Sequence, residues 1–476
     1  MDNNTQFYSR KELVKSVTYF IAFIVLCMVT NGIAFALLLP ITFFCVLTNK
    51  NESLLYLLFI ATTAMIVGTF FIPRSLPMVI SQKVLMLSAA MFLIVHIFGR
   101  LNVYLVPLLS LLPYILFMVA VSQVGWAPIV SNLKLFLFTM TFFALLGASA
   151  KLMSTRYDIR KLRTKILTVS IFIIFGSIFV IPFPGISEMN AELVLLNPDI
   201  ISLYQGVTYH SQALGVVAAM LGTLLFADFI FSIQRKDWLY YALILGCPIL
   251  IYKTASRTGL ASYFAGMAFV GYFAMRSRMV ARSWRLRLTT IVWSLVIGIS
   301  ISILVLPFMR EKVAKFITKN YSGDTTLVSE NIMGSRQAKI DFAIENWKHS
   351  PIIGNGFQVT EDMKYKQMDS IKDILSAPVE KSTWIVAILE EGGIFGMILF
   401  CIFIIVTLST FIRQKAYIGA ALLFEFLVVN LGEFGIFAMS AEGGMFWCMV
   451  CIGLVFDYNR KYVCSQMAMR NTAIHF

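Results

Sequence analysis

Long apolar runs, separated by short polar turns, cover most of the chain. Fourteen runs lie at about 17–31, 33–48, 53–72, 83–99, 101–122, 133–150, 164–181, 208–232, 237–254, 258–275, 288–307, 382–411, 416–432 and 440–456. A helix of about 20 apolar residues crosses the hydrocarbon core of a bilayer, so each run predicts one membrane span. The pattern therefore predicts an all-α, polytopic transmembrane helical bundle of about 14 spans. Boundaries that shift by a few residues allow 12–14.

The first two runs have two interpretations. They are short and meet at Asn31-Gly32, a dipeptide that is typical of turns. They form either two helices, which gives fourteen spans, or one long tilted helix, which gives thirteen. The second interpretation moves Arg10, Lys11 and Lys15 to the outer side of the membrane. Because Lys and Arg accumulate in cytoplasmic loops, these residues favour the first interpretation.

Basic residues mark one side of the predicted membrane. The loop 151–165 holds six basic residues and one acid, and the loop 276–287 holds five basic residues and no acid. With fourteen spans both loops lie on the cytoplasmic side, together with the N-terminus 1–16 and the tail 457–476. The loop 182–206 then lies outside.

The segment 308–380 is also outside and divides the bundle into 17–307 and 381–456. Part of it, SRQAKIDFAIENWK, predicts a helix because its apolar residues share one face. The residues of that face are Ile340, Ala343, Ile344 and Trp347. The following PIIGNGF ends the helix with Pro351 and the glycines Gly354 and Gly356. A segment this long between two spans predicts a functional element.

The composition excludes several classes of protein. Hydrophobic residues make up 59% of the chain and charged residues 13%, and the mean hydropathy is +0.81. A soluble domain carries roughly 25% charged residues, so these charges are too few to cover a water-facing surface. A soluble enzyme, a disordered chain and a disulfide-stapled secreted domain are therefore excluded. The net charge of +14 follows from topology and does not indicate a nucleic-acid partner.

Two arginines suit a phosphate group at the outer surface. Arg257 lies in TASRTG, between two apolar runs, where Thr258 and Gly259 open the next helix. A guanidinium fork beside the N–H groups of a helix start predicts anion binding, and Lys253 adds charge nearby. Arg336 opens the predicted helix of the long segment. Two arginines that meet over the membrane would form a diphosphate clamp, whereas snorkelling to lipid headgroups or solvation explains each arginine alone.

His210 and several carboxylates are further candidates. His210 starts a span in GVTYHSQALG, where an imidazole either binds a sugar and exchanges protons or packs at the helix end. Glu390 and Glu391 follow Lys381 in STWIVAILEEGGIFG. Since adjacent helical residues point in different directions, we expect at most one of them to face a cavity. Further buried-carboxylate candidates are Glu425, Glu433 and Glu442.

No metal or nucleotide motif occurs in the chain. HExxH, DxD, GxGxxG, P-loop and zinc-ligand spacings are absent, so we predict neither a metal site nor a cofactor. Cys448 and Cys451 form a CxxC, but they lie in the apolar run FWCMVCIGLVF without a second pair. We interpret them as helix-packing residues.

Four elements in order resemble the superfamily of O-antigen ligases and O-antigen polymerases. They are GVTYHSQALG at 206–215, SRTGL at 256–260, GSRQAKIDFAIENWKHSPIIGNGF at 334–357 and EKSTWIVAILEEGGIFG at 380–396. The ordered set, with the long segment in its place, carries the resemblance over about 160–456. These bacterial membrane glycosyltransferases have a GT-C-like helical fold and work at the periplasmic face of the inner membrane.

The resemblance implies the chemistry of the donor. The family transfers glycans from undecaprenyl diphosphate without metal or nucleotide, and its outer arginines bind the diphosphate. Here that role falls to Arg257 and Arg336, with Lys253 beside them. Glu391, Gly354, Gly356 and Trp347 would support the site. The implied partners are the undecaprenyl-diphosphate-linked oligosaccharide, membrane lipid and a chain-length regulator protein.

One departure from the family favours a polymerase. Ligases carry a His-Asn pair where the span after the long loop begins, and this chain has Ser382-Thr383 there. The general base then falls first to Glu380 and second to His210. We expect an enzyme that joins repeat units into a polysaccharide. The alternatives are a ligase that transfers glycan to lipid A-core and, in another class, a flippase for the same lipid.

Overall fold

The computed structural model describes most of the chain. The described residues are 8–48, 51–68, 71–72, 75, 78–81, 84, 105–154, 159–189, 203–231, 238–276, 328–361, 381, 383–432, 435–437 and 442–474. The predicted spans at 83–99 and 288–307 lie almost wholly outside these residues, as do Glu380 and Glu433.

The described chain is almost entirely helical. Its helices are α1 (Arg10–Val29), η2 (Ile33–Leu37), α2 (Leu38–Leu47), α3 (Asn51–Ile66), α5 (Leu105–Val124), α6 (Pro128–Ser154), α7 (Ile159–Ser170), η3 (Ile171–Phe175), α8 (Gly176–Phe179), α9 (Pro184–Ser187), α11 (Ser211–Phe231), α12 (Trp238–Lys253), α13 (Arg257–Arg276), α16 (Val328–His349), α19 (Trp384–Arg413), α20 (Tyr417–Val429) and α21 (Glu442–Ile474). Two short strands, β1 (Glu188–Met189) and β2 (Leu203–Tyr204), pair antiparallel, with Glu188 opposite Tyr204.

Seven helices of the described chain are long and apolar enough to cross a membrane. Their ranges are Arg10–Val29, Val106–Val124, Pro128–Gly147, Ile159–Phe179, Ser211–Phe231, Arg257–Arg276 and Trp384–Arg413. Four shorter apolar helices, of 10–17 residues, accompany them. The prediction of an all-helical membrane protein is confirmed. The count of about 14 spans and the GT-C-like arrangement stay predictions.

The first two apolar runs form separate helices. α1 ends at Val29, and the backbone then turns through Asn31 at a φ of 49° and Gly32 at a φ of 79°. Both values lie in the left-handed region, which a continuing right-handed helix does not enter. The interpretation of these runs as one long tilted helix is wrong, because the Asn-Gly dipeptide supplies the two residues that tolerate this turn best.

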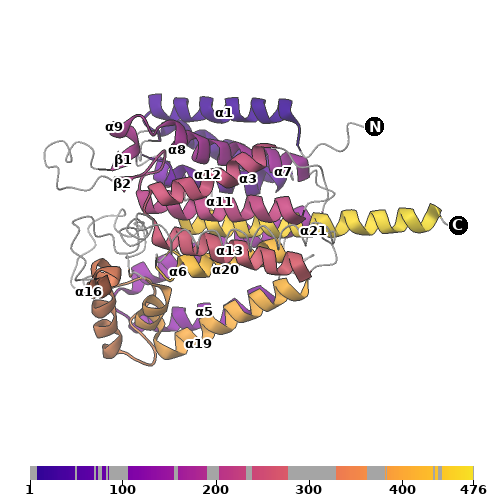
Figure 1. Cartoon of the computed structure of the whole chain (residues 1–476). Coiled ribbons are helices and arrows are strands. Elements are labelled where there is room, and N and C mark those ends of the chain that lie inside the picture. The colour runs from indigo at the N-terminus through magenta and orange to yellow at the C-terminus, as the bar shows by residue number, and fades with distance from the viewer. Residues whose placement is uncertain are drawn as a thin grey trace.

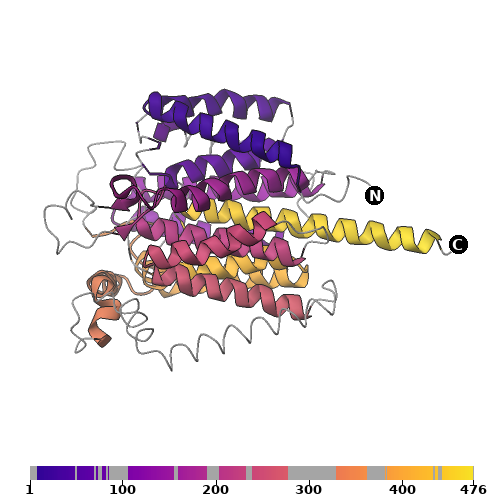
Figure 2. The same ribbon diagram turned by 45° about the horizontal axis from the view of Figure 1, so that its top comes forward.

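The helices lie side by side in one bundle, with distinct features at its two ends (Figure 1). α16 and the β1–β2 pair lie at one end, and the C-terminal half of α21 extends past the other. Figure 2 shows the same separation after rotation. We call the first the α16 end and the second the α21 end. The helices α11, α13, α20 and α21 pack against one another in the interior of the bundle.

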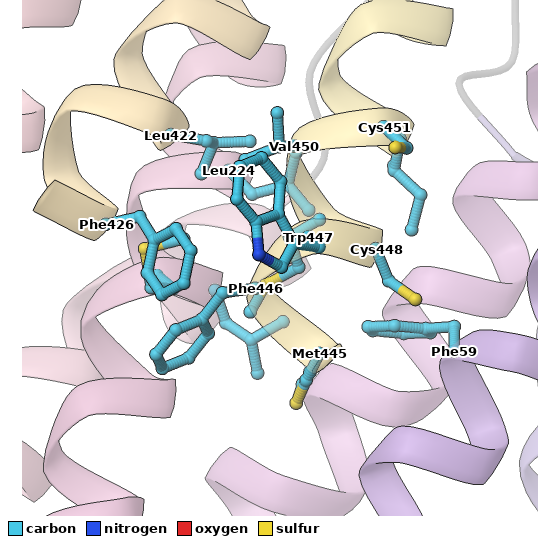
Figure 3. Packing of buried hydrophobic residues seen from close by; sticks show 14 of the residues in the cluster. Phe59, Leu224, Leu422, Phe426, Met445, Phe446, Trp447, Cys448, Val450 and Cys451 are labelled. Carbon is cyan, nitrogen blue, oxygen red and sulfur yellow. The ribbon is translucent and has the colours of Figure 1, made fainter. Parts of the chain in front are cut away.

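Aromatic and sulfur side chains fill the interior (Figure 3). The rings of Phe426 and Trp447 lie 5.4 Å apart at 86°, an edge-to-face pair that stabilises by about 0.5–1.5 kcal/mol beyond its buried area. Cys448 and Cys451 are buried in the same cluster, so their interpretation as packing residues is confirmed. Small residues bring the central helices close: a Cβ on Gly222 of α11 would lie 2.7 Å from the ring of Tyr263. Close packing of this kind drives helix association in a membrane, where the hydrophobic effect does not favour helix contacts over lipid contacts.

A kink in α19 receives the chain that follows α16. Gly393 leaves helical geometry with a φ of 61° and a ψ of −164°. The interruption opens two backbone donors: Ile394 N–H donates to Pro351 O at 2.9 Å and Phe395 N–H to Ile352 O at 3.1 Å. A Cβ on Gly393 would lie 2.3 Å from Ile352 O, so only glycine permits this approach.

Candidate functional site

The start of α13 is built to present backbone N–H groups. α12 ends at Lys253, and the chain turns through Ala255 at a φ of 50°. Ser256 then caps α13, because its buried Oγ accepts a hydrogen bond from Gly259 N–H at 3.1 Å. Arg257 is the first helical residue, so its side chain starts at the positive end of the helix dipole. This position suits an anion, as the TASRTG sequence predicted.

Arg336 reaches the same helix start from α16. Gly432 lies just beyond the end of α20, and Thr258 and Arg336 lie on the side where a side chain at this position would project. A Cβ on Gly432 would lie 2.0 Å from Thr258 Cγ2 and 2.8 Å from Arg336 Nη1. The guanidinium of Arg336 therefore lies next to the first turn of α13, where Arg257 precedes Thr258. Both arginine side chains are half-buried, whereas Lys253 is exposed.

His210 caps the neighbouring helix α11. Its Nδ1 accepts a hydrogen bond from Gln212 N–H at 3.1 Å, and its carbonyl accepts from Leu214 N–H at 3.2 Å. With Nδ1 engaged as an acceptor, the neutral ring carries its proton on Nε2. His210 is therefore arranged to donate a hydrogen bond. Its role as a base stays a prediction.

The starts of α11 and α13 lie side by side. A Cβ on Gly259 of α13 would lie 2.8 Å from Gly215 O of α11. A Cβ on Gly215 would in turn lie 2.3 Å from the Cβ of Ser256, the cap of α13. His210 and Arg257 thus occupy adjacent helix starts that open toward the α16 end of the bundle (Figure 1).

A carboxylate joins this group from α21. Tyr209 O–H donates to Glu442 Oε1 at 2.5 Å, the short length of a charge-assisted bond. Glu442 is the first residue of α21, where a negative charge suits the helix dipole. From the sequence, Glu442 was only a buried-carboxylate candidate. Its link to Tyr209, across more than two hundred residues, leaves no sequence signal. We call Arg257, Arg336, His210 and Glu442 the outer cluster.

A second, fully buried group lies at the start of α19. Lys381 Nζ lies 3.0 Å from Glu390 Oε2 and 3.0 Å from Glu391 Oε1. All three side chains are at most 2% exposed. We expected at most one of the two glutamates to face a cavity, and the structure directs both of them toward one lysine. Adjacent helical side chains diverge by about 100°, and a single ammonium between them still reaches both.

Charge pairing governs the lysine of this triad. Burial alone would lower the pKa of Lys381, but Glu390 and Glu391 outweigh that effect and raise the pKa above its ordinary value. Glu390 is also tied to α16, because Asn346 Nδ2–H donates to Glu390 Oε1 at 2.8 Å. The triad thus links the helix that carries Arg336 to α19.

The chain after α16 inserts into the bundle. Every residue of 354–360 is buried. Asn355 N–H donates to Glu390 O at 2.9 Å, and Gly356 N–H donates to Glu391 O at 3.0 Å. Lys381 Nζ donates to Val359 O at 2.8 Å. This burial was not predicted, because a Gly-rich, polar sequence is typical of an exposed loop.

All four residues expected to support the site lie at this insertion: Glu391, described above, and Gly354, Gly356 and Trp347. Gly354 has a φ of 77°, and a Cβ there would lie 2.3 Å from Glu391 O. Gly356 has a φ of 113°, which also favours glycine. Trp347 Nε1–H donates to Pro351 O at 3.0 Å and so fastens the end of α16 to the turn. These contacts are structural.

The remaining candidates lie elsewhere. Glu380 and Glu433 lie outside the described residues. Glu425 is fully buried in α20, where a Cβ on Gly266 of α13 would lie 2.9 Å from its Oε2. Within the part of the chain that the structure describes, no group of three His, Cys, Asp or Glu side chains gathers as a metal site would require.

Comparison with known families decides the class of the protein. The family model described as O-antigen ligase matches residues 241–401. The match over these residues supports a relation to the O-antigen ligase and polymerase superfamily. No curated protein sequence matches the chain.

The matched domain contains most of the geometry described above. It runs from α12 through α13 and α16 into α19, and it includes Arg257, Arg336 and the Lys381 triad. His210 and Glu442 lie outside it and join the cluster through α11 and α21. This match, together with the apolar helices, supports a membrane-bound transferase of O-antigen ligase or polymerase type.

Proposed function

We propose that this protein is a polysaccharide polymerase that joins oligosaccharide repeat units carried on undecaprenyl diphosphate. The observation that carries the proposal is the meeting of Arg336 with the first turn of α13, which begins with Arg257. Two guanidinium groups and the exposed N–H groups of a helix start would surround one diphosphate. The site would face the periplasm at the inner membrane, because the basic loops favour the opposite side as cytoplasmic.

The proposed chemistry is the departure of a diphosphate from the anomeric carbon of the donor. Negative charge develops on the leaving oxygen as the bond to the sugar breaks. Fixed positive groups in a water-poor site stabilise that charge most effectively, because they need no reorganisation during the reaction. Arg257 and Arg336 would supply the charge that a divalent cation supplies in many other transferases. We therefore propose a metal-independent reaction, with Lys253 at the rim.

The acceptor hydroxyl must lose a proton to a base. Glu380 remains our first candidate for that base, and it lies outside the described residues. His210 is better suited to hold a sugar hydroxyl through its Nε2–H, since Nδ1 accepts from the backbone. Glu442 would hold Tyr209 beside His210 and so shape the acceptor side of the site.

A ligase that transfers the glycan to lipid A-core is the second candidate. It is supported by the family model, whose description is O-antigen ligase. It is opposed by Ser382-Thr383, which stand where ligases carry His-Asn. The two activities share the donor and differ in the acceptor, so the acceptor distinguishes them.

The test is a reconstituted transfer assay. Purified protein in liposomes is mixed with undecaprenyl-diphosphate oligosaccharide from its own host, with EDTA and without nucleotide. We expect a ladder of repeat units that Arg257→Ala and Arg336→Ala each reduce at least a hundredfold. Lys348→Ala is the matched control, because this exposed residue of α16 pairs only with Glu345 in the surface salt bridge that the structure shows. Transfer only after lipid A-core is added would instead identify a ligase, and lipid movement without transfer would refute the enzyme.

A further inference from the structure

A cavity lies at the α21 end of the bundle, far from the outer cluster. Its volume is about 420 Å³, within the range of about 300–1,000 Å³ that is typical of ligand pockets. It is lined by α1, α2, α3 and α7, and it therefore lies outside the matched domain at 241–401. Residues of the first two turns of α1 and α7 line one part of it, which we call its mouth. These helix starts lie on the side where α21 leaves the bundle (Figure 1).

The mouth of the cavity is basic. Lys15 of α1 and the pair Lys161 and Lys165 of α7 line it, against one acid, Glu12. Three positive charges and one negative charge leave a net charge of +2. Lys15 and Lys161 are exposed. This arrangement attracts an anionic group.

Aromatic rings lie directly behind the lysines. Lys165 Nζ lies 4.5 Å from the ring centre of Tyr56, and Lys15 Nζ lies 5.5 Å from that of Tyr19. Tyr and Lys side chains are typical of the membrane interface, where ring bodies contact acyl chains and polar groups contact headgroups. The rings thus mark the depth at which a headgroup would end and acyl chains would begin.

The body of the cavity is apolar. Phe20, Leu38 and Ile60 are buried in its wall, and Phe23 is half-buried there. If only a free phosphate ion were bound, these apolar side chains would stay exposed to water. An acyl chain would cover them. Buried apolar area stabilises a bound chain by about 0.8 kcal/mol for each CH₂ group.

We propose that this cavity binds one anionic phospholipid of the leaflet at the α21 end. Lys15, Lys161 and Lys165 contact the phosphate, and an acyl chain lies along Phe20, Phe23 and Ile60. Basic pockets between membrane helices are known to hold such headgroups. The proposal does not depend on the proposed function, because no residue of the outer cluster takes part.

Native mass spectrometry of the delipidated full-length protein tests the proposal. Dioleoyl phosphatidylglycerol is titrated beside dioleoyl phosphatidylcholine, which has the same chains and no net charge, and beside glycerol phosphate, which has no chains. We expect one phosphatidylglycerol to bind at least tenfold more tightly than phosphatidylcholine. Lys15→Gln/Lys161→Gln should weaken that binding by about fivefold for each charge removed. The control Lys339→Gln/Lys348→Gln removes two exposed charges at the α16 end and should change nothing.

Three results would overturn the proposal. Equal binding of phosphatidylcholine would remove the charge requirement. Displacement of the lipid by an equal concentration of glycerol phosphate would show a site for free phosphate. If both double variants weakened phosphatidylglycerol binding equally, the lipid would be attracted by the overall charge of the protein and not by this cavity. Photo-cross-linking of wild-type protein with a diazirine-acyl phosphatidylglycerol needs no variant: label should fall within 10–29, 38–66 and 159–170, and label confined elsewhere refutes the site.

Discussion

Arg336 and Thr258 meet over Gly432, and no larger residue fits between them. A Cβ on Gly432 would lie 2.0 Å from Thr258 Cγ2 and 2.8 Å from Arg336 Nη1. The residues just after α20 therefore contact both the guanidinium of Arg336, from α16, and the first turn of α13. Asn430 fixes the backbone around Gly432 through two hydrogen bonds. Its Oδ1 accepts from Gly435 N–H at 2.7 Å, and its carbonyl accepts from Trp384 N–H at 2.9 Å.

Gly432→Ala should move Arg336 away from the first turn of α13 without removing either arginine. The added methyl must displace Thr258 or Arg336, and such overpacking costs about 1–3 kcal/mol. We expect transfer activity in the reconstituted assay to fall about 10–100-fold while the protein still purifies as a folded species. Gly435→Ala is the control: the nearest atom to its Cβ would be Asn430 Oδ1, at 3.9 Å. Equal activity in the two variants would show that this contact does not position the site.

Arg336→Lys tests whether the guanidinium acts as a fork or only as a charge. An ammonium keeps the charge but cannot make two parallel hydrogen bonds to a phosphate. We expect kcat/KM for the lipid-linked donor to fall at least tenfold, less than in Arg336→Ala. Arg413→Lys, at the exposed far end of α19, should match wild type. Full activity in Arg336→Lys would reduce the role of Arg336 to that of a point charge.

Lys381→Met should unfold the site by leaving two buried carboxylates without their cation. Removing one partner of a buried ion pair costs about 3–5 kcal/mol. Lys348 and Glu345 form a shorter pair, 2.7 Å against 3.0 Å, but both side chains are more than half exposed. Lys348→Met should therefore cost about 0–1 kcal/mol. The two variants are compared by thermal unfolding in detergent, and a similar loss in both would mean that burial does not set the strength of the triad.

A second change separates charge imbalance from lost packing. Lys381→Met/Glu390→Gln/Glu391→Gln removes all three charges together. Because the unpaired carboxylates are then gone, the triple variant should unfold at a higher temperature than Lys381→Met alone. A triple variant less stable than the single one would show that the lysine acts mainly through Val359 O, its backbone acceptor.

The sequence was informative where function depends on local order. The apolar runs predicted membrane helices, and TASRTG predicted a helix opened by Thr258 and Gly259, one residue after its observed start at Arg257. Helix starts are encoded within a few residues. The Asn31-Gly32 turn was also visible, and the structure chose between its two interpretations. Each of these features is set by neighbours in the chain.

Features that depend on contacts across the chain were missed or wrong. Nothing in the pattern connects Gly432 with Thr258, or Tyr209 with Glu442, since each pair is brought together only by helix packing. The rule that adjacent helical residues face apart is correct locally. It failed for Glu390 and Glu391 because one long lysine side chain bridges both directions.

His210→Asn distinguishes a substrate contact from a helix cap. The asparagine side-chain oxygen can accept the hydrogen bond from Gln212 N–H that His210 Nδ1 accepts now. Asn therefore keeps the cap and loses the Nε2–H donor. We expect its unfolding temperature to match wild type while KM for the acceptor rises at least tenfold. His210→Ala should lose both functions, with a stability loss of about 1 kcal/mol. If Asn retains wild-type kinetics and only Ala is impaired, His210 serves the helix alone, and the acceptor must be held by other residues of the outer cluster.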